Sequence, residues 1–382
     1  MASNEPMAAD RMPQVMEVQK TSKRVYAAVA SVANCTCHRF YFQLQCESEK
    51  GADSERHENG KRTALATSNF KLCLTPSGTE ENVSCTCLAV RTEGTPTSSP
   101  APPPPYSVLP PEEAATVMKH KKKLQFVYET DGSAASLNAT LTDLCSSVRS
   151  LSTRINTPSY LGALPSTDAH RHIYTESQKP SVSRISLPRV FERAPLSRTR
   201  SILPPTRRYR LAWILSASLL RFGFYTTNWF RENWRSGDIY FMQEGNSSIA
   251  LDFPHISVHF NPSTSKPAYS NGTCLAKNEQ LYSLAIALIE IGYGDTLMNL
   301  CMEGEKGDAA DKEWNHAREY AGAQGLAKAI DRVMGRRYAF VVLRCFYCDF
   351  AIDEDLTPAR LQRAFYEKVE CELRGCMVEF SG

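Results

Sequence analysis

RYRLAWILSASLLRF, from Arg208 to Phe222, contains the strongest apolar run of the chain. Its apolar residues recur at helical spacing and form one face, made of Leu211, Leu215, Leu219 and Phe222. The run is about ten residues long, half of the roughly twenty that a membrane-spanning helix needs, and arginines flank it on both sides. We therefore expect a helix buried in a protein core and no transmembrane segment.

The rest of the C-terminal half predicts further helices. Three more apolar stripes have helical spacing: Leu281, Leu284, Leu288 and Ile291; Leu326, Ile330 and Val333; and Leu361, Phe365, Val369 and Leu373. Tyr338 to Tyr347 is almost continuously apolar and is expected to be buried. Between the first two helices, residues 238–242 and 249–253 could form a short hairpin.

The N-terminal half predicts strands. HRFYFQLQ (His38 to Gln45) alternates apolar and polar residues, and residues 69–75 and 84–91 repeat that pattern. Residues 123–128 predict a further strand, and Leu137 to Leu151 predicts a helix with Leu137, Leu141, Leu144 and Val148 on one face. The proline-rich stretch 95–111 interrupts this order and is expected to be an exposed, extended insertion.

The order of these segments predicts four regions. Residues 1–22 are expected to be a disordered leader and 23–151 a β-rich domain. Residues 152–206, rich in Ser, Arg and Pro, are expected to be a hinge-like linker with one short helix near 187–193, and 207–382 a helical domain. A small mixed sheet followed by helices is an α+β fold with two lobes.

Composition excludes several classes of protein. The 382 residues carry a net charge of only +3, which argues against a dedicated nucleic-acid-binding domain. Met1 to Gln19 lacks the apolar segment of a secretory signal, so we expect a cytoplasmic or nuclear protein. In such a compartment the 13 cysteines are expected to be reduced thiols.

The order of strands, one helix and then a helical half resembles that of a protein kinase. Seven stretches resemble a largely fungal, uncharacterised kinase-like family, domain of unknown function 7580: CTCHRFYFQLQ (35–45), DLCSSV (143–148), RYRLAWILSASLLRF (208–222), GDIYFM (237–242), NEQLYSLAIALIEIGYG (278–294), RRYAFVVLRCFYCDF (336–350) and FYEKVECEL (365–373). The resemblance implies a degenerate, pseudokinase-like two-lobe fold. It implies no established activity.

The residues that phosphoryl transfer requires are missing from the sequence. A kinase needs a glycine-rich loop, a strand lysine, a catalytic aspartate with a downstream asparagine, and a metal-binding aspartate. No GxGxxG occurs, and aromatic Trp229, Phe230 and Trp234 stand where the His-Arg-Asp loop is expected. We expect these rings to pack in the core. Because the residues required for phosphoryl transfer are missing, the sequence assigns no catalytic, cofactor-binding or metal-binding residue.

A divergent phosphotransferase is the alternative. Asp252, in Leu251-Asp252-Phe253-Pro254, stands where the metal-binding Asp-Phe-Gly of a kinase would follow the hairpin, and the lysine run 121–123 precedes a predicted strand. The helix at 280–291 keeps Tyr282, Ser283 and Glu290 at fold-supporting positions of the kinase pattern. However, Gln280 replaces the aspartate that braces a kinase's catalytic loop.

Zinc binding is a third hypothesis. Cys35-x-Cys37-His38, Cys85-x-Cys87 and Cys345-x-x-Cys348 are short pairs of possible ligands. The first two pairs have one-residue spacing within predicted strands, and the third lies in a very apolar run. The pattern therefore favours buried structural cysteines over a metal site.

The motifs with the clearest meaning indicate binding. Pro103-Pro104-Pro105-Tyr106 is a PPxY motif, in which Pro103, Pro104 and Tyr106 suit the groove of a WW domain. Unpaired arginines between 184 and 210 could form a mobile basic segment, and phosphorylation of Ser201 could pair with them. We expect a non-catalytic, pseudokinase-like scaffold or interaction module in an intracellular fungal regulatory protein, with a protein partner.

Overall fold

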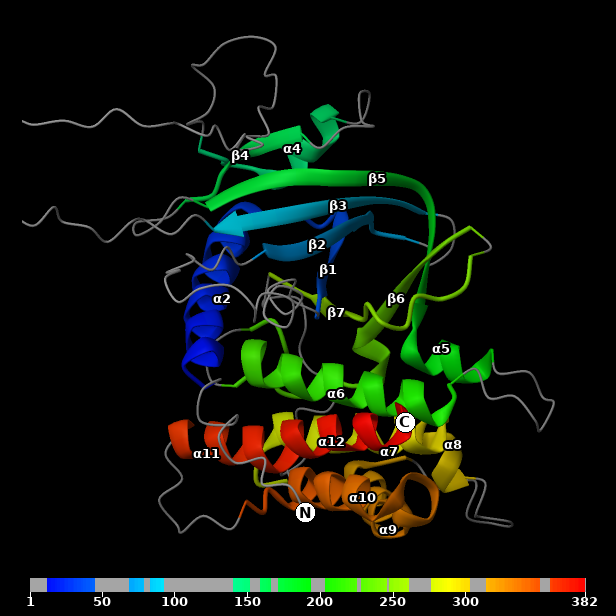
Figure 1. Ribbon diagram of the computed structural model, residues 1–382. Coiled ribbons are helices and arrows are strands. Elements are labelled where there is room, and N and C mark those ends of the chain that lie inside the picture. The colour runs from blue at the N-terminus through cyan, green and yellow to red at the C-terminus, as the bar shows by residue number, and fades with distance from the viewer. Residues whose placement is uncertain are drawn as a thin grey trace, which may run out of the picture.

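The computed structural model describes residues 12–44, 69–78, 83–92, 140–151, 159–165, 171–193, 203–224, 228–245, 247–260, 276–302, 314–350 and 358–381. Within these ranges a barrel of strands lies above a layer of helices (Figure 1). The predicted α+β class is therefore confirmed, and the C-terminal region is mainly helical as expected.

Six antiparallel strands form the barrel: β1 (His38–Gln43), β2 (Asn69–Pro76), β3 (Val83–Thr92), β5 (Arg171–Ser186), β6 (Ile239–Glu244) and β7 (His255–Val258). Their order is β3-β2-β1-β7-β6-β5, and pairing of β3 with β5 closes the ring. A short strand, β4 (Ser159–Ala163), pairs with β5. All ladders between these strands are antiparallel, so the expected mixed sheet is wrong.

The expected linker 152–206 is wrong, because its largest part is β5. This strand pairs with β3, β4 and β6 and is central to the barrel. Arg184 on β5 is buried and donates hydrogen bonds to Tyr41 Oη of β1 (3.0 Å) and Thr75 Oγ1 of β2 (2.9 Å), neither of which is a neighbouring strand. These bonds cross the barrel interior. A strand with arginine and threonine on its buried positions lacks the apolar alternation that predicts strands.

The prediction of a disordered leader over residues 1–22 is also wrong where the structure describes these residues. Residues 12–32 form helix α2 (Met12–Val32), so the strands do not begin near residue 23. Its buried stripe includes Val25, Val29 and Val32, and the amide of Gln19 donates to the backbone oxygen of Leu220, 2.6 Å away. Valine, a poor helix former, lines that stripe, and packing against α6 (Pro205–Phe222) stabilises the helix.

Helix α6 (Pro205–Phe222) confirms the prediction of a buried helix, and it lies between the barrel and the helices that follow it in the C-terminal region (Figure 1). It is buried on almost all sides. Ser218 donates to the Leu44 backbone oxygen at the barrel end (2.6 Å), and Tyr209 donates to the Met334 backbone oxygen in the helical layer (2.7 Å). Barrel and helices thus share one hydrophobic core.

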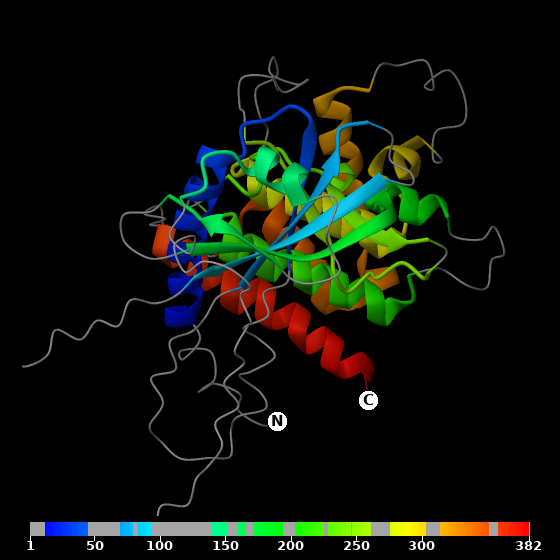
Figure 2. The same cartoon turned by 90° about the horizontal axis from the view of Figure 1, so that it is seen from above.

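The remaining elements are α4 (Leu144–Leu151), α5 (Leu187–Glu192), a 3-10 turn (Ser236–Asp238), α7 (Glu279–Tyr293), α8 (Leu297–Met302), α9 (His316–Ala329), α10 (Asp331–Tyr347), α11 (Pro358–Phe365), a π-helical turn (Tyr366–Glu370) and α12 (Cys371–Ser381). Figure 2 shows α12 projecting from beneath the barrel. The short helix near 187–193 is confirmed as α5. Among the described helices, none has the length and apolar character that crossing a bilayer requires.

Two predictions for the C-terminal half of the chain need correction in detail. The predicted hairpin exists, but its second strand is β7, after Pro254, and both strands belong to the barrel rather than to the helical domain. Val333 is half exposed because the predicted stripe 326–333 spans the junction between α9 and α10. The predicted strand 123–128, the insertion 95–111 and residues 1–11 lie outside the described residues.

Candidate functional site

The three aromatic residues that the sequence predicts to pack in the core do so. Trp229, Phe230 and Trp234 are all buried. Trp229 stacks on Phe42 of β1 with ring centroids 4.2 Å apart, and its indole nitrogen donates to Ser22 Oγ of α2 at 2.9 Å. These rings join α2, the barrel and the helical layer, so they stabilise the fold.

Asp252, which a divergent phosphotransferase would use as a metal ligand, lies on the surface. Its carboxylate pairs with Arg210 of α6 at 3.0 Å, and both side chains are about half exposed. Asp252 lines neither of the two cavities discussed below. The lysines at 121–123 are outside the described residues, so the structure does not bring this pair of candidates together.

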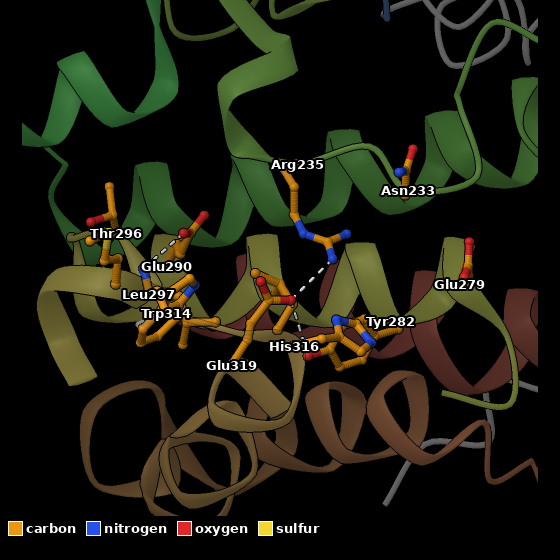
Figure 3. A pocket seen from close by; sticks show the side chains of 12 residues that line it. Asn233, Arg235, Glu279, Tyr282, Glu290, Thr296, Leu297, Trp314, His316 and Glu319 are labelled. Atoms are coloured by element: carbon orange, nitrogen blue, oxygen red, sulfur yellow. Dashed lines mark hydrogen bonds and ion pairs between the residues drawn. The ribbon is translucent and has the colours of Figure 1, made fainter. Parts of the chain in front are cut away.

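A cavity of about 250 Å³ lies instead between α7, α8, α9 and the segment 233–235. Figure 3 shows its side chains. Its lining comprises Asn233, Arg235, Glu279, Tyr282, Ile286, Glu290, Thr296, Leu297, Met298, Trp314, His316 and Glu319. The volume is below the 300–1,000 Å³ range that is typical for drug-sized ligands. The cavity therefore suits a single side chain or a small molecule.

One polar network holds the middle of this cavity. Arg235 pairs with Glu319 at 3.1 Å, donates to Ser283 Oγ at 2.8 Å, and lies with its guanidinium 5.5 Å from the ring centre of Tyr282. Tyr282 Oη donates to the same Glu319 oxygen, 3.3 Å away. The network fixes the α7 and α9 walls relative to each other, and it neutralises Glu319.

Glu290 and His316 carry polar atoms without partners among the described residues. Glu290 accepts the backbone N–H of Leu297 at one carboxylate oxygen (2.8 Å), whereas its second oxygen, Oε2, is buried and unpaired. His316 Nε2 is likewise buried and unpaired. Burial raises the pKa of Glu290 above its ordinary value. A buried acceptor without a donor costs about 1–3 kcal/mol, which a bound donor recovers.

The lining is acidic overall. Glu279, Glu290 and Glu319 face one arginine, and that arginine is already paired with Glu319. Tyr282 and Trp314 add aromatic rings, which already lie near Arg235 and Arg318 respectively. The cavity thus combines acidic groups, an unpaired acceptor and aromatic rings. No short motif links these residues, so sequence reasoning noted only Tyr282 and Glu290, as fold-supporting positions.

The structure brings the first cysteine pair together with a residue that the sequence did not single out. Cys35, Cys37 and His38 lie next to Cys145, at the start of α4, and their four ligand atoms all lie within 4.8 Å of one another. Cys35 and Cys37 lie in the connection between α2 and β1 rather than in a strand. Because 107 residues separate His38 from Cys145, no spacing rule predicts this set.

The other cysteine pairs differ from one another. Cys85 and Cys87 face the barrel interior with Cys73, where a second cavity of about 340 Å³ also holds Lys179 and His255. Cys345 is buried in α10, and burial raises its pKa. Cys345 and Cys348 join no cluster of possible metal ligands within the described part of the chain.

The arginines between 184 and 210 do not form an unpaired basic segment where they are described. Arg208 donates to the backbone oxygens of Leu203 (2.8 Å) and Gly292 (2.5 Å), and Arg189 pairs with Glu192 at 2.8 Å. Together with Arg184 and Arg210 above, they support the fold. Ser201 and the PPxY residues Pro103, Pro104 and Tyr106 lie outside the described residues, so their roles stay predictions.

Comparison with known proteins gives one match. A family model described as "Domain of unknown function (DUF7580)" matches residues 110–374, more than half of the chain. Comparison with curated proteins found no match. Comparison with solved structures found none either. The description of the matching family names neither a kinase nor any other activity.

Proposed function

Because this chain belongs to the family described as "Domain of unknown function (DUF7580)", whose description gives no activity, we propose its function from its geometry. It is a non-catalytic binding module of kinase-like layout, and its cavity between α7, α8 and α9 recognises a basic side chain of a protein partner. The observation that carries this proposal is the unpaired, buried Oε2 atom of Glu290 in an acidic, aromatic-walled cavity.

The chemistry of recognition follows from the pKa of Glu290. Burial keeps the carboxyl protonated more readily than usual, since an isolated buried charge is costly. An entering ammonium or guanidinium group stabilises the carboxylate and donates to Oε2. Trp314 and Tyr282 then shield the pair from water, which strengthens its electrostatic attraction. A neutral side chain of equal length does not stabilise the carboxylate by charge and gains no such electrostatic attraction.

Fluorine NMR tests this proposal directly, because the chain has only four tryptophans. In protein labelled with 5-fluorotryptophan, titration with the peptide acetyl-Gly-Arg-Gly-amide is expected to shift the Trp314 resonance. The Trp213 resonance, from a ring that contacts Arg374 outside the cavity, is expected to stay in place. A Trp314→Phe sample assigns the signal.

Two controls separate recognition from non-specific binding. The peptide with glutamine in place of arginine is expected to cause no shift, and Glu290→Gln is expected to weaken arginine binding at least tenfold, about 1.4 kcal/mol. Glutamine can still accept the Leu297 N–H, so this variant is expected to fold. Glu372→Gln, on α12 outside the cavity, is the matched variant that keeps binding. Equal shifts with both peptides would contradict the proposal.

The alternative, a phosphotransferase that uses Asp252, makes a different prediction. For a binding module without nucleotide chemistry, millimolar ATP with magnesium is expected to leave the melting temperature unchanged, since only ligands of the folded state raise it. Thermal-shift titration of the wild type and Asp252→Ala measures this. A magnesium-dependent rise that Asp252→Ala abolishes would favour the phosphotransferase.

The wider setting of this function rests on sequence alone. Binding of a WW domain by Pro103, Pro104 and Tyr106, and a role in a fungal regulatory protein of the cytoplasm or nucleus, remain proposals. A second recognition element of that kind would act together with the helical cavity, since two linked sites on one partner raise the overall affinity.

A further inference from the structure

We propose that Cys35, Cys37, His38 and Cys145 bind one structural Zn²⁺ ion. Their three Sγ atoms and the Nδ1 atom of His38 form a compact set of four. Thiolates and imidazole are the ligands of structural zinc sites, and a set of three cysteines and one histidine is among the common combinations. Four protein ligands leave no open position for substrate, so the ion has a structural role.

The distances between the ligand atoms fit a tetrahedral site. Four atoms at ordinary Zn–S and Zn–N bond lengths lie about 3.5–3.8 Å from one another. Nδ1 of His38 is 3.3 Å from Sγ of Cys37, 3.3 Å from Sγ of Cys145 and 3.7 Å from Sγ of Cys35. The Cys37 and Cys145 sulfurs are 3.2 Å apart. The set is therefore already close to the dimensions of a zinc site.

The local structure holds each ligand in place. Cys35 and Cys37 follow the end of α2, and His38 is the first residue of β1. The backbone N–H of Cys145 donates to Oδ1 of Asp143 at 2.9 Å, which fixes the first turn of α4. A bound ion would thus fasten α4 to the junction between α2 and the barrel.

The charges around the cluster also suit zinc. Three thiolates, a neutral imidazole and Zn²⁺ sum to −1, and Arg149 lies one turn beyond Cys145 on α4. The positive charge of Arg149 partly balances the net negative charge of such a site.

The barrel cluster provides a matched comparison. Cys73, Cys85 and Cys87 also lie within 4.8 Å of one another, but they form a set of only three. Nε2 of His255 is 3.6 Å from the Cys73 sulfur, and His255 is not part of the compact set. A variant of this cluster therefore removes a clustered thiol without removing a proposed zinc ligand.

Metal analysis of the full chain, purified without chelators, tests the proposal. The wild type and Cys87→Ser are expected to contain about one zinc per chain, and Cys37→Ser less than about one tenth of that. Zinc that persists in Cys37→Ser but disappears in Cys87→Ser would place the ion in the barrel and overturn the assignment. A Cys37–Cys145 disulfide in zinc-free wild type would also overturn it.

A second measurement uses only the wild type, in case Cys37→Ser does not fold. Protein loaded with Co²⁺ in place of zinc is expected to show strong thiolate-to-cobalt charge transfer and the intense visible bands of tetrahedral coordination. One equivalent of Zn²⁺ is expected to abolish them, because zinc binds more tightly to such a site. Absence of thiolate bands, or the weak bands of six-coordinate cobalt, would show that the site does not exist.

Discussion

Replacement of Trp229 by alanine is expected to lower the free energy of unfolding by about 3–5 kcal/mol, the usual cost of removing a buried large aromatic side chain. Trp229 is fully buried, stacks on Phe42 and meets Tyr26 edge-on with ring centroids 4.9 Å apart. The substitution therefore opens a cavity where α2, the barrel and the helical layer meet. Domains are typically stable by only 5–15 kcal/mol, so the variant is expected to be partly unfolded when heated moderately.

Urea unfolding followed by circular dichroism measures this loss, and two further variants identify its cause. Trp229→Phe keeps an aromatic ring but loses the bond to Ser22 Oγ, and is expected to cost about 1–2 kcal/mol. Phe340→Ala removes a ring that is 50% exposed and is expected to change the free energy by less than about 1 kcal/mol. A Trp229→Ala protein as stable as Phe340→Ala would show that the aromatic cluster does not hold the layers together.

The Trp229 cluster also shows what the sequence could predict. Helices α6 and α7 lie within a few residues of their predicted positions, because long apolar runs bury almost every side chain and packing dominates there. Strands β1, β2 and β3 were found by their period-2 alternation. Trp229, Phe230 and Trp234 are buried, as predicted. In each case a side chain's local pattern and its final environment agree.

The sequence does not predict the features that depend on contacts between distant parts of the chain. On β5, the buried Arg184 bonds to Tyr41, Thr75 and Gly78, all more than a hundred residues earlier in the chain. The local sequence of this strand therefore resembles a polar linker. Cys145 completes a metal-ligand set only because α4 folds back onto β1. The helical cavity draws Arg235, Glu290 and His316 from three separate segments. None of these groupings leaves a periodic signal in the sequence.

Acidification is expected to destabilise this protein through His255, by about 2 kcal/mol between pH 7 and pH 5. Burial in the barrel lowers the pKa of His255 to about 4. In the unfolded chain the imidazole accepts a proton near pH 6.5. Between these values the unfolded state binds more protons than the folded state, so stability is present above pH 6.5 and is lost as pH falls toward 4. Below pH 4 both states are protonated, and this contribution stops changing.

The surroundings of His255 explain the direction of the shift. Burial is the largest cause and Lys179 adds to it, whereas the interaction with Cys87 and a backbone hydrogen bond with Phe253 act in the opposite direction without outweighing burial. His255→Phe keeps a ring without a titrating proton, so the loss on acidification is expected to be about 2 kcal/mol smaller than in the wild type. Between pH 7 and pH 8.5 the two proteins are expected to respond alike.

If His255→Phe does not fold, NMR titration of the wild-type His255 ring gives the same information. A midpoint near 6.5 would show that the barrel interior is wet enough to charge this histidine, and the predicted acid sensitivity would then have no source there.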